Sequence, residues 1–176
     1  MKRNIALWQL VGFFLSCILG TLLHFLYDLS GRNFIAALIS GVNESTWEHM
    51  KLLYFPMLIF AVVQSRYFKD YSEFWCVKLV GTLVGLVMIP VLFYTCNGAF
   101  GKSPDWVNIT IFFVAAAIAF IAETYLFKKG NIRCPSQWGA IILIALIGVA
   151  FLVFTFKTPR IPLFCDPITG DYGLPR

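Results

Sequence analysis

Residues 138–156 have the sequence WGAIILIALIGVAFLVFTF, which contains no charged side chain. As an α-helix rising about 1.5 Å per residue, this stretch is about 28 Å long, close to the hydrocarbon thickness of roughly 30 Å. Four further apolar stretches have similar lengths, and they cover residues 5–28, 45–65, 74–96 and 106–127. The sequence therefore predicts an all-α, polytopic membrane helix bundle with about five transmembrane helices.

The composition agrees with an integral membrane protein. Hydrophobic residues make up 59% of the 176 residues and charged residues 13%, whereas soluble domains have about 25% charged residues. We expect a single integral membrane domain over residues 1–176, in which residues 158–176 form a proline-rich extramembrane tail. The net charge of +5 is scattered over the connecting segments, so the expected partner is the lipid bilayer and not nucleic acid. The sequence does not indicate an oligomeric state.

Residues 33–42 form another apolar segment, which is short for a bilayer crossing. As a helix this segment would rise only about 15 Å, half of the hydrocarbon thickness. We expect a short re-entrant or interfacial segment here, and a sixth crossing is the alternative.

The basic residues predict the orientation in the membrane. With the N-terminus in the cytoplasm, most lysines and arginines before the last stretch fall on the inner side, and Lys78 is counted among them. Lys157 and Arg160 in the tail fall on the outer side and oppose this assignment. We expect a multi-pass protein of the cell membrane with a cytoplasmic N-terminus.

Small and charged residues within the apolar stretches indicate how the helices meet. The G-x-x-x-G pair at 81–85 and the alanine-rich patch at 115–119 are typical of close helix packing. Glu123 lies near the inner end of its stretch. There it is expected to pair with Lys128 or Arg66 at the membrane interface.

The five cysteines show no C-x-x-C spacing, which disfavours a zinc or redox centre built on them. Cys96 and Cys165 are expected on the same outer side, so a disulfide between them is a minor alternative. The sequence also contains no phosphate loop or serine-nucleophile elbow, which disfavours those reactions.

Residues 43–51, NESTWEHMK, place polar and charged side chains at the start of the second stretch. Ionisable groups near the bilayer centre cost roughly 2.5–3.5 kcal/mol each, so such a cluster indicates a functional site. Glu44, Glu48 and Lys51 would share one face of a helix, and we hypothesise that they are catalytic, with a carboxylate as general base. The alternative is structural: either Ser45 and Glu48 form a capping box or Asn43 caps the helix, and Lys51 pairs with Glu48.

Two histidines and an aspartate are candidate metal ligands. His24 and Asp28 lie one helical turn apart on a polar stripe of the first stretch. Together with His49 and the nearby carboxylates they would form a mixed nitrogen and oxygen site, so a divalent metal is the hypothetical cofactor. The alternative is an interfacial histidine and aspartate pair that caps the helix end.

The tail contains polar residues that would lie on the same side as this cluster. Asp166, Asp171 and Tyr172 follow one another in a series of turns. We hypothesise that they form a lid and bind substrate together with Asn43 and Trp47. A solvated terminal tail is the alternative, because chain ends are usually loosely held.

A resemblance rests on three parts of the sequence: His24 with Asp28, the N-E-S-T-W-E-H-x-K run at 43–51, and the D-P-x-T-G-D-Y-G run at 166–173. These parts resemble a family of small bacterial multi-pass membrane proteins that is catalogued only as a domain of unknown function. The resemblance covers nearly the whole chain and implies a membrane location and a helical architecture. It implies no substrate or reaction, so the residue roles above rest on physical arguments alone.

Three classes of function remain open from the sequence. The working hypothesis is an outward-facing site, metal-bound or substrate-binding, of a hydrolase or transferase that acts on a lipid-linked substrate. A small-molecule or ion transporter is the second class, and it requires polar groups along a path through Gln9, Ser16 and Thr82. The third is an accessory or structural membrane protein, in which the charges would pair locally.

Overall fold

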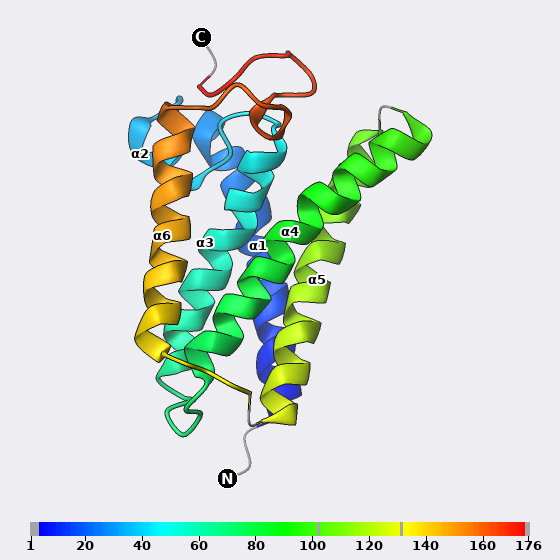
Figure 1. The fold of residues 1–176 in the computed structure, drawn as a ribbon. Coiled ribbons are helices and arrows are strands. Elements are labelled where there is room, and N and C mark those ends of the chain that lie inside the picture. Colours follow the sequence, from blue (N-terminus) through cyan, green and yellow to red (C-terminus); the bar gives the residue numbers. More distant parts are fainter. Residues whose placement is uncertain (1–3, 102, 131, 175–176) are drawn as a thin grey trace.

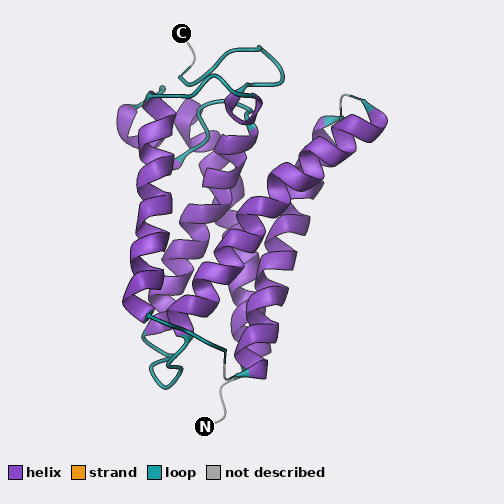
Figure 2. Ribbon diagram, viewed as in Figure 1, coloured by secondary structure: helices purple, strands orange, loops and turns teal. Residues whose placement is uncertain are grey.

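A computed structural model describes residues 4–101, 103–130 and 132–174. Within these ranges the chain forms α1 (Ile5–Leu29), α2 (Phe34–Ile39), α3 (Thr46–Ser65), α4 (Phe74–Phe100), α5 (Asp105–Lys129), α6 (Gln137–Phe156) and a 3-10 helix, η1 (Pro162–Phe164). The long helices run side by side, and loops connect them at the two ends of the bundle (Figures 1 and 2). We call these ends the N-terminal end and the tail end, because residues 157–174 cover the latter (Figure 1).

The expected all-helical fold is confirmed, and the expected spans coincide with long helices. Among the described residues, α1, α4, α5 and α6 are long and apolar enough to cross a membrane. The fifth expected span corresponds to α3, which has 20 residues but carries polar side chains in its first turns. It packs against α1 and α4.

Side-chain caps and a glycine set several helix boundaries. The Ser45 hydroxyl accepts a hydrogen bond from the Glu48 amide at 3.4 Å, and the Ser136 hydroxyl accepts one from the Gly139 amide at 3.0 Å. These bonds satisfy amides that have no partner within the helix. At the end of α5, Gly130 adopts a φ of 58°, which a side chain would disfavour. Ser45 therefore caps α3 as the structural alternative expected, but the return bond of a capping box does not form, because the Ser45 amide donates to Asn43 Oδ1.

The short apolar segment contains α2 alone, which has six residues. It lies at the tail end of the bundle beside α6 (Figure 1). A sixth crossing is therefore wrong, because a helix of this length rises only about 9 Å. Ala36, Ala37 and Ser40 of the segment are buried, so it forms part of the packed tail end.

Small residues let α4 and α5 approach each other closely. A Cβ atom added at Gly85 would lie 3.0 Å from the Cβ atom of Ala119. Ala115 and Ala116 are fully buried on the same helix as Ala119. The packing role expected for these residues is confirmed.

A buried ion pair joins α4 and α5 near the N-terminal end. The Lys78 Nζ atom lies 2.6 Å from the Glu123 Oε2 atom, and both side chains are almost completely buried. The rings around the ammonium group lie 5.2 to 5.8 Å away and belong to Phe60, Phe74, Phe120 and Phe127. The expected pairing of Glu123 with Lys128 or Arg66 is wrong. The antiparallel α4–α5 hairpin places the start of α4 beside the end of α5, where Lys78 reaches the carboxylate first.

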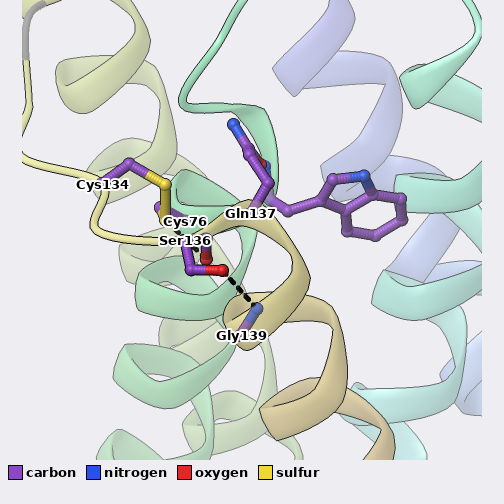
Figure 3. Close-up of a disulfide and its surroundings, with 6 residues drawn as sticks. Cys76, Cys134, Ser136, Gln137 and Gly139 are labelled. Atoms are coloured by element: carbon purple, nitrogen blue, oxygen red, sulfur yellow. Dashed lines mark hydrogen bonds between the residues drawn. A yellow bond between two sulfur atoms is a disulfide. The ribbon is translucent and has the colours of Figure 1, made fainter.

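A disulfide between Cys76 and Cys134 links the start of α4 to the loop between α5 and α6 (Figure 3). Next to it, the Gln137 Oε1 atom accepts a hydrogen bond from the Trp75 amide at 2.8 Å. These contacts hold α6 against α4 at the N-terminal end. The minor alternative of a disulfide between Cys96 and Cys165 is wrong, since both are free thiols.

Candidate functional site

Three side chains from separate segments converge at the tail end of the bundle. His24 comes from α1, Glu44 from the loop before α3, and His49 from the first turn of α3. Each offers one nitrogen or oxygen atom, and these atoms all lie within 4.8 Å of one another. The His24 Nε2 atom is 3.6 Å from Glu44 Oε1, and the His49 Nε2 atom is 3.6 Å from Glu44 Oε2. We call these three residues the His–Glu cluster.

The ring of His49 has a defined orientation and tautomer. Its Nδ1 atom lies 3.0 Å from the Ser45 carbonyl oxygen. Because a carbonyl oxygen only accepts, Nδ1 carries a hydrogen, and the other ring nitrogen, Nε2, faces Glu44. Backbone carbonyls often hold metal-binding histidines in this way.

The distances within the cluster are longer than those of direct hydrogen bonds. A distance of 3.6 Å exceeds the usual N–H···O range of about 2.7–3.2 Å. Ligand atoms about 2.0–2.1 Å from a tetrahedral zinc ion are about 3.3 Å apart. Two imidazoles and one carboxylate also form a ligand set of catalytic zinc sites, in which water takes the fourth position. The two distances of 3.6 Å are close to this spacing, whereas the three atoms together lie within 4.8 Å of one another.

A cavity of about 340 Å³ lies beside the cluster, between α1, the start of α3 and α5. It is lined by Gly20, Thr21, His24, Phe25, Glu44, His49, Leu52, Asn108, Ile109, Phe112, Phe113 and Ile168. A second cavity of about 50 Å³ also reaches Glu44, His49 and Asn108. At this end the α4–α5 hairpin leans away from α3 and α6 (Figure 1).

The tail folds over the loop that carries Glu44. The Asn43 amide group donates a hydrogen bond to the Gly173 carbonyl oxygen at 2.8 Å. The Asp166 carboxylate accepts bonds from the Ile168 amide at 2.7 Å and from the Glu44 amide at 3.4 Å. These bonds bring Ile168 to the wall of both cavities. Asn43 and Asp166 hold the tail in place, and neither lines either cavity.

The other candidate substrate-binding residues have different surroundings. The Trp47 ring packs against Phe164 of η1, with ring centroids 4.7 Å apart, and so anchors the tail to α3. Asp171 and Tyr172 are exposed on the outer turn of the tail. None of these three candidates lines either cavity.

Glu48 and Lys51 form a separate buried pair that faces away from the cavity. The Lys51 Nζ atom lies 2.5 Å from Glu48 Oε2. It also donates hydrogen bonds to the Ala37 carbonyl oxygen and the Thr155 hydroxyl, both at 3.0 Å. The Val42 amide donates to Glu48 Oε2 at 3.1 Å. The pair thus joins α2, α3 and α6, and the expected grouping of Glu48 and Lys51 with Glu44 on one face does not form.

Asp28 is not part of the cluster. Its Oδ1 atom lies 3.4 Å from the Nε atom of Arg32, and both side chains are largely exposed.

Sequence reasoning missed Asn108 as a cavity residue, although an amide side chain within an apolar stretch was a usable signal. Phe112 and Ile168 gave no such signal, because their place in the wall depends on how α5 and the tail pack.

Comparison with known proteins places the whole chain in one family. Neither the curated proteins nor the solved structures include a match. The model of the family described as "Family of unknown function (DUF6512)" matches residues 1–174, and the chain therefore belongs to that family.

Proposed function

We propose that the protein is an integral membrane hydrolase or transferase whose His–Glu cluster binds a catalytic zinc ion. The observation that carries this proposal is the convergence of His24, Glu44 and His49, with the Nε2 atom of His49 directed into the cluster. In this proposal the three side chains are the protein ligands. A zinc ion held there would supply an activated water molecule, because zinc lowers the pKa of bound water to about 7. Hydrolysis then adds one water molecule across the bond that is cleaved.

In this proposal α3 crosses the membrane as the fifth span. Its 20 residues rise about 30 Å, enough for the hydrocarbon core. The charges of Glu48 and Lys51 neutralise each other in a buried pair, so they do not expose charge to lipid. The packing of α3 between α1, α4 and α6 agrees with this placement.

The contacts within the bundle favour an enzyme over the two other classes. For transport, a polar path would have to pass Gly12, where the rings of Phe60 and Phe120 fill the space that a side chain would need. For an accessory protein, all the charges would pair locally, as those of Asp28 with Arg32, Glu48 with Lys51 and Glu123 with Lys78 do. Glu44 instead faces two imidazoles.

We expect purified protein to bind about one zinc ion per chain. His24→Ala and His49→Ala are each expected to weaken zinc binding at least about 10-fold. Removing the hydrogen-bond partner of a metal ligand already lowers metal affinity by this much, and removing the ligand itself lowers it at least as much. Asp28→Asn is the matched control, since Asp28 neighbours His24 on the exposed side of α1 but pairs with Arg32. Isothermal titration of the metal-free protein with zinc measures these affinities. Equal binding by wild type and His24→Ala would overturn the proposal.

We propose that the N-terminal end faces the cytoplasm. Lys51 and Lys78 lie in buried pairs and do not contribute to the charge of the loops. The remaining described basic residues at the N-terminal end are Arg66, Lys69, Lys128, Lys129 and Arg133, and those at the tail end are Arg32, Lys157 and Arg160. This excess supports a cytoplasmic N-terminal end. The disulfide lies at that same end, so cellular thiols are expected to reduce it.

Labelling of intact cells with a membrane-impermeant maleimide tests this orientation. Cys165, a free thiol in the tail, is expected to react from outside. In a Cys76→Ser variant, Cys134 has no disulfide partner in any redox state, and it is expected to react only after the cells are permeabilised. The reverse labelling pattern would place the disulfide end outside the cell and the His–Glu cluster on the cytoplasmic side.

A further inference from the structure

We propose that the cavity of about 340 Å³ binds the hydrocarbon chain of a single-chain amphiphile, with the carbonyl group of that molecule beside the His–Glu cluster. The part of this inference that concerns a reaction at the His–Glu cluster rests on the proposed function. Binding of the chain itself is a separate property and can be measured without any metal.

The cavity changes from polar to apolar with depth. His24 lies five residues before the end of α1, whereas Gly20 lies about one turn deeper, or about 6 Å. Leu52 and Phe113 line the cavity at similarly greater depth along α3 and α5. The polar end thus lies toward the water and the apolar end toward the bilayer centre. An amphiphile in the same leaflet has its polar and apolar parts in this order.

Two wall residues connect the cavity to the lipid side of the bundle. Phe25 on α1 and Ile109 on α5 both line the cavity and are 55% and 58% exposed. Exposed apolar side chains on membrane-spanning helices face lipid tails. A chain can therefore move sideways from the bilayer into the cavity, between α1 and α5, without crossing water.

The volume of the cavity fits one hydrocarbon chain but not two. Ligand cavities measure about 300–1,000 Å³, and this one lies at the lower limit. It suits a single acyl chain and is too small for both chains of a phospholipid.

Asn108 supplies a polar contact near the carbonyl position. Its side chain lines both cavities, and its Oδ1 atom is buried without a hydrogen-bond partner among the described residues. Buried amides usually have partners. Its Oδ1 atom can accept a hydrogen bond from a hydroxyl group of a bound amphiphile, such as that of a protonated carboxylic acid, which would orient the head group toward His24 and His49.

Photolabelling of the reconstituted, metal-free protein with palmitic acid carrying a mid-chain diazirine tests the inference. Label is expected in the peptides that contain Phe25 and Phe113, and unlabelled palmitic acid is expected to compete for it. Ile109→Trp fills the cavity and should reduce this labelling at least about fivefold, which corresponds to an overpacking cost of about 1 kcal/mol. The matched control is Ile121→Trp, an exposed position on α5 away from the cavity.

The outcomes separate this inference from the proposed function. Label that is spread evenly over the lipid-facing helices of the wild-type protein would overturn the inference. Label that unlabelled palmitic acid does not displace would also overturn it. Labelling that Ile109→Trp leaves unchanged would do the same. Competed labelling in a protein that binds no zinc would support the chain site and refute the metal centre.

Discussion

Lys78→Met is expected to lower the free energy of unfolding by about 3–5 kcal/mol, because it leaves the Glu123 carboxylate buried without its cation. The surroundings of Glu123 offer little to stabilise its unpaired negative charge. A ring of phenylalanines encloses the site. Gly81 adjoins the Glu123 side chain, so the carboxylate has little space to turn away. Unfolding in mixed micelles of mild detergent and dodecyl sulfate measures the loss.

Two further variants identify the cause of this loss. Lys128→Met removes an exposed lysine near the same end of the bundle, and its effect is expected to stay within about 0.5 kcal/mol. The double variant Lys78→Met with Glu123→Leu removes both charges and is expected to recover most of the stability. A double variant no more stable than Lys78→Met would show that the pair is not the source of the effect.

Lys51→Met is expected to destabilise the protein by a similar amount, about 3–5 kcal/mol, and also to loosen the tail end. Lys51 neutralises Glu48 and donates to the end of α2 and to Thr155 of α6. Its loss frees the loop that carries Glu44. Amide hydrogen exchange should therefore rise in residues 33–44, and zinc affinity should fall although no ligand has changed. Lys78→Met should not raise exchange selectively in that segment.

The control for Lys51→Met is Lys157→Met, which removes an exposed lysine next to α6. This control is expected to leave both exchange and zinc affinity unchanged. If Lys51 were instead a catalytic residue, as the sequence suggested, Lys51→Met would leave stability near that of wild type. Such a result would also contradict the bridging role of the buried pair.

The helices could be predicted closely because apolar length is a local property. The stretch at 74–96 became α4, Phe74–Phe100, and the stretch at 138–156 became α6, Gln137–Phe156. The small-residue packing at Gly85 was also predictable, since only small side chains let two helices approach so closely. The boundary at Ser45 was recognisable from its capping pattern.

The arrangement of the candidate site was less predictable, because it depends on backbone outside the helices. The shared face of Glu44 and Glu48 presupposed a helix that begins before Glu44, but α3 begins at Thr46. Glu44 therefore points from the loop toward His24, while Glu48 turns to Lys51. The pairing of Lys78 with Glu123 was within reach, because an antiparallel hairpin aligns the start of α4 with the end of α5. The fold of the tail over Glu44 depends on contacts more than 120 residues apart in sequence.

The most direct test of the metal centre is the zinc X-ray absorption spectrum of the purified, zinc-loaded protein. We predict nitrogen and oxygen ligands at about 2.0–2.1 Å, with the outer-shell scattering of two imidazole rings. That scattering should diminish in His49→Ala. A sulfur shell at about 2.3 Å, from any of the free cysteines, or a spectrum without imidazole scattering would contradict a zinc ion held by His24, Glu44 and His49.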